Sequence, residues 1–258
     1  MSMYVITHKK FNYPISQGYV PLLVGANKNE NPNNYETDNA GENISNKNPN
    51  YSELTGLYWL WKNNHDKNIG ISHYRRYFSK CSTNNTLYYR TVILGSPIPI
   101  TTKRLDEYLK TYDWIIPTPE IVEEGSMEKH FIHCHHKQDL IITKEVVQEM
   151  YPEYIDSFEK FMHGNKASFF NMFYTTKQQM DNYCEWLFKI LFEVEKRVDI
   201  SNYDAYQKRL FGFLSERLFN IWLEYNQPNI KYLATFNTDL VSRLWAVKQV
   251  KHKVLGWN

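Results

Sequence analysis

The chain has 258 residues, of which 42% are hydrophobic and 22% are charged, so it is long enough to bury a substantial core. Its 30 basic and 28 acidic residues give a net charge of +2, which excludes a polyacidic or histone-like protein and disfavours nucleic-acid binding. Aromatic residues reach 16%, and their rings suit core packing as well as stacking on sugars or bases.

Two short apolar runs near the N-terminus predict buried strands over Met3–Ile6 and Tyr19–Val24. The Asn-rich segment 27–50 follows and predicts a long loop, which is either solvated or presents its amides to a polyhydroxy ligand. A helix is expected to begin at Asn50, because asparagine is a good N-cap and Glu53 follows three residues later as its reciprocal partner.

Strand and helix patterns alternate further along the chain. They predict a strand over Asn68–Phe78, a short helix over Leu105–Leu109 and a strand over Asp113–Pro117. The last third is more helical, with a strand over Phe169–Tyr174 and then two helices, Asp181–Arg197 and Tyr203–Tyr225. This alternation predicts an α/β fold with a mostly parallel sheet.

We expect a single domain over residues 1–240 and a basic amphipathic tail over residues 241–258. No acid follows Asp239, whereas basic residues and tryptophans do, and such a segment is typical of a peripheral membrane contact. The alternative is an ordinary terminal helix that docks by its apolar face. No signal-peptide pattern and no apolar run of about 18 residues is visible, so a cytoplasmic protein is expected.

Cys81, Cys134 and Cys184 are widely spaced and form no CxxC pair. Neither a disulfide framework nor a thiolate zinc site is therefore expected. The histidine-rich segment 130–136 contains His133 and His136 at a spacing compatible with metal ligation on a helix, but nothing like an HExxH motif is present, and we favour a surface cluster.

The run His73-Tyr74-Arg75-Arg76 at the end of an apolar strand is the strongest local signal for a site. Ligands bind at the carboxyl ends of strands in open α/β sheets, and guanidinium groups match phosphate oxygens. Strand alternation predicts that Arg75 and Arg76 point to opposite faces, so that one of them enters a given site. The alternative is that one or both of these arginines form salt bridges at the rim of the sheet.

A second signal is a charge within an apolar helix face. Arg217 falls inside the arc formed by Leu210, Leu214 and Leu218, so it must be paired or line a cavity. Glu216 could pair with a basic group or act as a general base. A structural ion-pair cluster is the alternative.

Several ordered motifs resemble one known family. They include Val24-Gly25-Ala26, Asp38-Asn39, the run ELTGLYW at Glu53–Trp59, the run HYRRYF at His73–Phe78, and the run from Gly212 to Leu218. Together they cover roughly residues 3–225 and resemble the DUF4422 family of bacterial capsular- and exopolysaccharide-type glycosyltransferases.

The resemblance implies a GT-A-like fold and transfer of a hexosyl unit, for which galactose is our guess, from a UDP-sugar to a lipid-linked glycan acceptor. It implies catalytic roles for Glu216, His73 and Arg217. Glu216 is expected as the catalytic carboxylate or as a partner of Arg209 and Arg217. The nucleotide-sugar-binding residues that it implies are Thr7, His8, Lys9, Gly25, Ala26, Asp38, Asn39, Asn43, Tyr74, Arg75, Arg76, Asn171, Met172 and Arg209.

Many GT-A enzymes hold Mn²⁺ or Mg²⁺ on a DxD motif, whereas His73–Arg76 places cations there. We therefore assign no metal ligand and expect cations to replace the metal, although Asp38, Asp113 or the histidines leave a metal site open. Two other readings stay open: a non-catalytic glycan- or nucleotide-binding module of the same fold, and a phosphate-ester enzyme that clamps its substrate with the two arginines.

Overall fold

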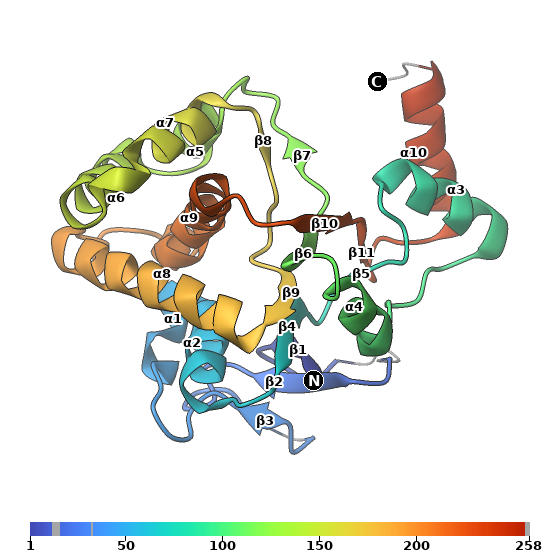
Figure 1. Ribbon diagram of the computed structural model, residues 1–258, viewed down its shortest axis with the longest axis horizontal. Coiled ribbons are helices and arrows are strands. Elements are labelled where there is room, and N and C mark those ends of the chain that lie inside the picture. Colours follow the sequence, from blue (N-terminus) through green and yellow to red (C-terminus); the bar gives the residue numbers. More distant parts are fainter. Residues whose placement is uncertain (12–15, 32, 256–258) are drawn as a thin grey trace.

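The computed structural model describes residues 1–11, 16–31 and 33–255, with side chains described up to residue 251. In these residues a nine-stranded mixed sheet forms the centre of the molecule (Figure 1). Seven strands lie side by side in the order β10 (Ile230–Leu233), β6 (Trp114–Pro117), β9 (Phe173–Thr176), β4 (Asn68–His73), β1 (Ser2–Thr7), β2 (Tyr19–Leu23) and β3 (Glu36–Thr37). Two further strands, β5 (Arg76–Phe78) and β11 (Thr235–Asn237), pair with each other, and β5 also pairs with β4.

The direction of the strands explains where a site can form. β1 runs parallel to both β2 and β4, and β10 runs parallel to β6. β9 lies antiparallel between β4 and β6, so the sheet is mixed in its middle. The carboxyl ends of β1, β2 and β4 therefore meet at one edge of the sheet, the usual position of a ligand in such folds.

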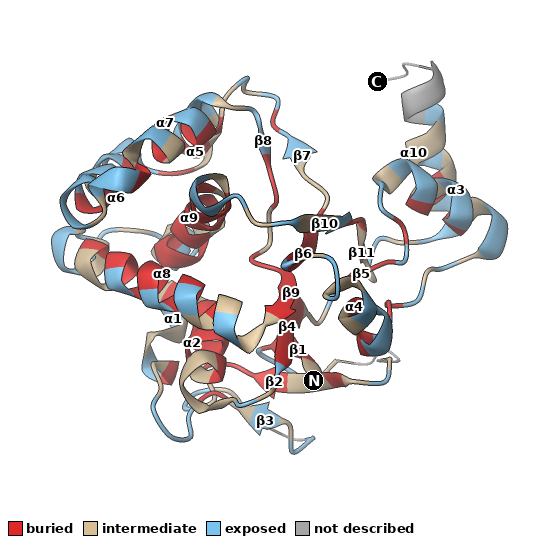
Figure 2. Ribbon diagram, in the orientation of Figure 1, coloured by how far each residue is buried: buried red, intermediate tan, exposed pale blue. Residues whose placement is uncertain are grey.

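Both faces of the sheet are covered, because the central strands are apolar on both sides. Tyr4 and Ile6 of β1 face one hydrophobic cluster, whereas Met3 and Val5 face another. The first cluster includes side chains from α2 (Leu54–Asn63), α8 (Lys177–Arg197) and α9 (Leu210–Asn226), and the second includes side chains from α3 (Asn84–Leu94) and α4 (Thr102–Tyr108). Figure 2 shows buried residues along the strands and on the helix faces turned toward them.

The remaining helices extend these two layers. α5 (Met127–Cys134), α6 (Lys137–Met150) and α7 (Ile155–His163) form a group that packs on α8 and α9 (Figure 1). A two-stranded sheet, β7 (Glu120–Ile121) with β8 (Lys166–Ala167), joins this group to the rest of the molecule. On the other side, α10 (Arg243–Leu255) packs against α3, where the rings of Trp245 and Tyr88 meet edge to face. No helix in the described part of the chain combines the length and the apolarity needed to cross a membrane.

Most predicted elements are confirmed, but four differ from the prediction. The predicted strand over 68–78 is a hairpin in which Tyr74 and Arg75 form the turn between β4 and β5. Asn50 caps no helix, because it lies inside a short helix, α1 (Asn48–Tyr51), and α2 begins at Leu54. The predicted helix over 203–225 begins only at Leu210, after a 3-10 turn over Gln207–Arg209.

The strand predicted over 169–174 begins later than expected, at Phe173. Phe170 and Asn171 have positive φ angles of 79° and 50°, which no extended strand contains. The preceding chain is therefore a tight turn that places the main chain of Phe170 beside the carboxyl end of β4.

Gly70 is required where β4 and β9 pair. A Cβ atom on Gly70 would lie 2.4 Å from the carbonyl oxygen of Phe173 and 2.9 Å from the Cα of Tyr174. Only a residue without a side chain allows this close approach of two main chains.

The division of the chain into one domain over residues 1–240 and a tail over residues 241–258 stays a prediction.

Candidate functional site

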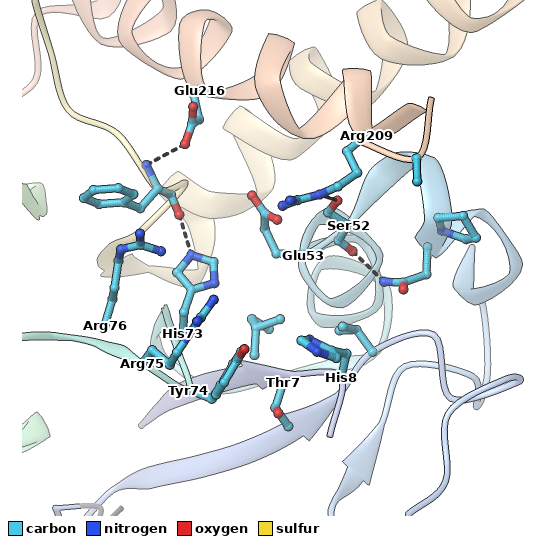
Figure 3. A pocket seen from close by; sticks show the side chains of 16 residues that line it. Thr7, His8, Ser52, Glu53, His73, Tyr74, Arg75, Arg76, Arg209 and Glu216 are labelled. Carbon is cyan, nitrogen blue, oxygen red and sulfur yellow. Dashed lines mark hydrogen bonds between the residues drawn. The ribbon is translucent and has the colours of Figure 1, made fainter. Parts of the chain in front are cut away.

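A cavity of about 510 Å³ opens at the carboxyl ends of β1, β2 and β4 (Figure 3). Its floor comes from strand ends and its walls come from α1, the 170–171 turn and the start of α9. The lining residues are Ile6, Thr7, His8, Val24, Asn48, Pro49, Ser52, Glu53, His73, Tyr74, Arg75, Arg76, Phe170, Ala205, Arg209 and Glu216.

The hairpin turn brings all four residues of the run His73–Arg76 to the cavity. The prediction that alternation separates Arg75 from Arg76 is therefore wrong, because alternation applies within one strand, whereas Arg75 lies in the turn and Arg76 begins β5. The Arg75 guanidinium lies 4.9 Å from the Tyr74 ring centroid and forms an exposed 3.3 Å ion pair with Asp239. The Arg76 guanidinium lies 4.2 Å from the Phe170 ring centroid.

Positive charge dominates one wall of the cavity. Burial lowers the pKa of Arg76, with Arg75 as a further cause, so the two guanidinium groups repel each other there. Arg209 enters from the opposite wall, where its Nε donates a 3.0 Å hydrogen bond to Ser52 Oγ. An anion bound between these arginines would relieve their repulsion.

The buried setting of His73 favours the neutral form of its imidazole. Burial lowers its pKa, and its Nε2 lies 2.5 Å from the carbonyl oxygen of Phe170. Because a carbonyl oxygen accepts only, Nε2 carries the hydrogen and Nδ1 keeps a lone pair. The arginines, and not His73, therefore supply the positive charge of the cavity.

Glu216 is held rigidly at the cavity wall. The Phe170 amide donates a 2.8 Å hydrogen bond to Oε1, and Arg217 Nη1 donates a 3.0 Å hydrogen bond to Oε2. Burial nevertheless raises the pKa of this carboxyl group above its usual value of 4.5. A carboxylate with a raised pKa inside a cavity is a candidate proton acceptor.

Arg217 lies behind Glu216 and does not line the cavity. It is only 4% exposed, and its guanidinium lies 5.4 Å and 5.7 Å from the ring centroids of Phe131 and Phe169. The expectation that Glu216 pairs with both arginines is half right: Arg217 is its partner, whereas Arg209 binds Ser52. Arg217 is thus placed to position Glu216, not to contact a ligand.

Glu53 is a second carboxylate in the cavity, although its sequence pattern predicts only a helix-capping residue. Its Oε1 accepts a 2.7 Å hydrogen bond from Asn171 Nδ2. Asn171 is 4% exposed and also bonds Gly212 and Ser215. It therefore orients Glu53 and lies outside the cavity lining, so its expected contact with donor or acceptor stays a prediction.

Met172 and Asp38 also lie outside the cavity lining. Met172 is fully buried in the cluster on the other side of the sheet. Asp38 is fully buried as well, and its carboxylate accepts hydrogen bonds from the amides of Gly25 and Ala26 and from Ser45 Oγ, at 2.9, 3.1 and 2.6 Å. It thus fixes the loop after β2, and the prediction that these residues contact the donor finds no support in their placement.

The remaining expected residues belong to the rim or to the Asn-rich loop. Lys9 Nζ lies 5.5 Å from the Tyr74 ring centroid, just outside the lining. Asn39 and Asn43 form hydrogen bonds within their own loop. The Asn39 side chain donates to Asn27 Oδ1, and the Asn43 side chain donates to the carbonyl oxygens of Asn39 and Gly41. Of the expected set, the structure brings these to the cavity: Thr7, His8, His73, Tyr74, Arg75, Arg76, Arg209 and Glu216.

The residues of the cavity suit a divalent metal poorly. Two of its lining residues, Glu53 and Glu216, carry a carboxylate, whereas Arg75, Arg76 and Arg209 place three positive charges on its walls. Asp113 lies elsewhere and accepts the Asn229 amide at 2.8 Å. A hard cation such as Mg²⁺ needs several oxygen ligands in a negative surrounding, and these walls are positive instead.

Comparison with known proteins identifies relatives of this fold. The family model "Domain of unknown function (DUF4422)" matches residues 2–227, whereas no curated protein matches the chain. The chain is similar to the apo structure of WbbM, a bifunctional glycosyltransferase, with 28% sequence identity and a TM-score of 0.80. The similarity covers 92% of this chain and 45% of the WbbM chain, so this chain spans less than half of that protein.

The predicted α/β fold is thus confirmed, and it is the fold of part of a glycosyltransferase. The family match includes every residue of the cavity. Since it extends over nearly the whole chain, the protein belongs to the DUF4422 family.

Proposed function

We propose that the protein is a GT-A-like glycosyltransferase that moves a hexosyl unit, galactose being our choice, from a UDP-sugar to a glycan acceptor in capsular or exopolysaccharide synthesis. The observation that carries the proposal is a cavity at the carboxyl ends of β1, β2 and β4 that combines arginines with the half-buried carboxylate of Glu216. The similarity to WbbM supports it. A lipid-linked acceptor and a cytoplasmic location belong to the same proposal.

The donor has a natural orientation in this cavity. Thr7 and His8 at the end of β1 suit the nucleoside, and the diphosphate would lie between Arg75 and Arg76 on one side and Arg209 on the other. Guanidinium groups would then neutralise the leaving diphosphate, the task that Mn²⁺ or Mg²⁺ performs on a DxD motif.

Glu216 would act as the base. It takes the proton of an acceptor hydroxyl, whose oxygen forms the new bond to the anomeric carbon while the bond to the UDP oxygen breaks and UDP leaves. Its two oxygens each accept one hydrogen bond in the free protein, so lone pairs remain for this proton. A single displacement of this kind inverts the anomeric centre.

UDP should stabilise the protein against heat, and EDTA should not remove this effect. A ligand at about one hundred times its Kd adds about 2.7 kcal/mol to the free energy of unfolding, which a thermal-shift measurement detects. GDP, CMP and dTDP serve as comparisons. A shift that needs Mn²⁺ would contradict the role of the arginines, and no shift with any nucleotide would favour a glycan-binding module.

We further propose that α3 and α10 contact an anionic membrane surface. Four large apolar side chains are more than 60% exposed on or beside these helices, namely Ile93, Leu94, Ile98 and Leu244. Exposed Arg90, Arg243, Lys248 and Lys251 lie on the same two helices. Apolar side chains among basic ones are typical of an interfacial contact.

Sedimentation with vesicles tests this surface. The protein should bind vesicles that contain phosphatidylglycerol and not those of phosphatidylcholine alone. The double variant Ile93→Glu/Leu244→Glu should weaken binding about tenfold or more, because burial of each side chain contributes about 1.5–3 kcal/mol. Ile141→Glu on α6 is the matched control, since Ile141 is also exposed but lies in the other helix group. Equal binding by both variants would contradict the proposal.

A further inference from the structure

A second cluster of chemically reactive side chains lies outside the cavity, where the chain passes from β7 into α5. Gly125 has a positive φ of 84°, which turns the chain back so that Glu124 faces α5. Ser126 then caps the helix, with its side chain accepting from the Lys129 amide. None of the residues of this turn lines the cavity.

Three side chains of different chemistry converge at this turn. His130 and Cys134 are four residues apart on α5 and therefore share one helix face. One ligand atom from each, together with a carboxylate oxygen of Glu124, lies within 4.8 Å of the other two. Ligand atoms around a tetrahedral zinc ion lie about 3.5 Å apart, so small side-chain movements would close the site.

We propose that Glu124, His130 and Cys134 bind a zinc ion, with water in the fourth position. Thiolate, imidazole and carboxylate are the donors that Zn²⁺ takes, whereas Mg²⁺ and Ca²⁺ take oxygen donors. The Cys134 thiol gives its proton to water when it binds. All three side chains are partly exposed, so the ion can reach them from solvent.

The rival explanation is a simple contact without metal. Glu124 Oε2 lies 3.0 Å from His130 Nδ1, and Glu124 Oε1 lies 3.9 Å from His133 Nδ1. A contact between the Glu124 carboxylate and two histidines would need no cysteine beside it. The thiol of Cys134 therefore distinguishes a zinc site from such a contact. No thiolate zinc site is expected from the sequence, because it has no CxxC pair. That argument applies to paired cysteines and does not exclude a site whose ligands come from a turn and a helix.

Cobalt and zinc titrations of the chelator-treated protein test the site. Co²⁺ should bind one to one and give a near-ultraviolet thiolate charge-transfer band, which zinc then removes by competition. Cys134→Ser should abolish this band and weaken zinc binding about 100-fold or more, because even residues that only support ligands contribute 10- to 100-fold. Glu124→Gln should keep the band and weaken affinity.

Two controls keep the result interpretable. Cys81→Ser and His163→Gln remove a cysteine and a histidine elsewhere and should leave the titration unchanged. Circular dichroism shows whether each variant is folded, and zinc should protect Cys134 of the folded wild type from a maleimide. Failure to bind zinc at micromolar concentration, or an unchanged cobalt spectrum in Cys134→Ser, would overturn the proposal.

Discussion

Replacing Glu216 with glutamine should lower kcat by a factor of about 10²–10⁴ while UDP still binds. Glutamine keeps the shape of the side chain and an oxygen that can accept from the Phe170 amide. It cannot take up a proton from an acceptor hydroxyl, so the proposed chemical step is removed. The ion pair with Arg217 is lost as well, and circular dichroism should show that the variant is still folded. Donor affinity from the thermal shift and turnover from UDP release separate the two effects.

The pH profile provides an independent measure of the same role. Burial raises the Glu216 pKa above 4.5, and the base is active only when deprotonated. The wild-type kcat should therefore rise with pH through this raised pKa. The residual activity of Glu216→Gln should not show this rise.

Glu53→Gln is the matched comparison, since Glu53 is the other carboxylate of the cavity. This substitution removes the negative charge near His73 but leaves the hydrogen bond between the Phe170 amide and Glu216 intact. If Glu53→Gln lost turnover and Glu216→Gln kept it, Glu53 would be the base. If both variants kept turnover, the proposed mechanism would be wrong.

Structural features that depend on nearby residues could be predicted from the sequence. The strand at Met3–Ile6 and the long helix ending at Arg197 are confirmed, because an unbroken apolar run and a helical apolar face each identify one structure. Arg217 is also found from its helix face alone, as a charge that must be paired.

Features that depend on distant partners could not be predicted. The hairpin at Tyr74–Arg75 contains no glycine or proline, and β5 exists because it pairs with β11, about 160 residues further along the chain. Glu53 belongs to the cavity through its bond to Asn171, 118 residues away. No local signal marks either contact.

Asp38 shows a different limit. An acid in an Asn-rich loop has the composition of a ligand-binding residue, but its carboxylate is enclosed by three donors from the same part of the chain. Composition indicates which groups are present, whereas only the folded loop decides which way they point.

Arg217→Met should lower the free energy of unfolding by about 3–5 kcal/mol, the usual effect of breaking a buried ion pair. Methionine fills the space between Phe131 and Phe169 but leaves the Glu216 carboxylate, which is half-buried, without its cation. Urea denaturation at neutral pH measures the loss.

The double variant Arg217→Met/Glu216→Gln should recover a large part of this loss, because no unpaired charge then remains buried. Arg104→Met is the matched control: Arg104 pairs with Glu107, but both side chains are more than 40% exposed, and such pairs contribute about 1 kcal/mol or less. If Arg217→Met lost no more stability than Arg104→Met, the Glu216 carboxylate would have to be solvated. It would then lack the raised pKa that its role as a base requires.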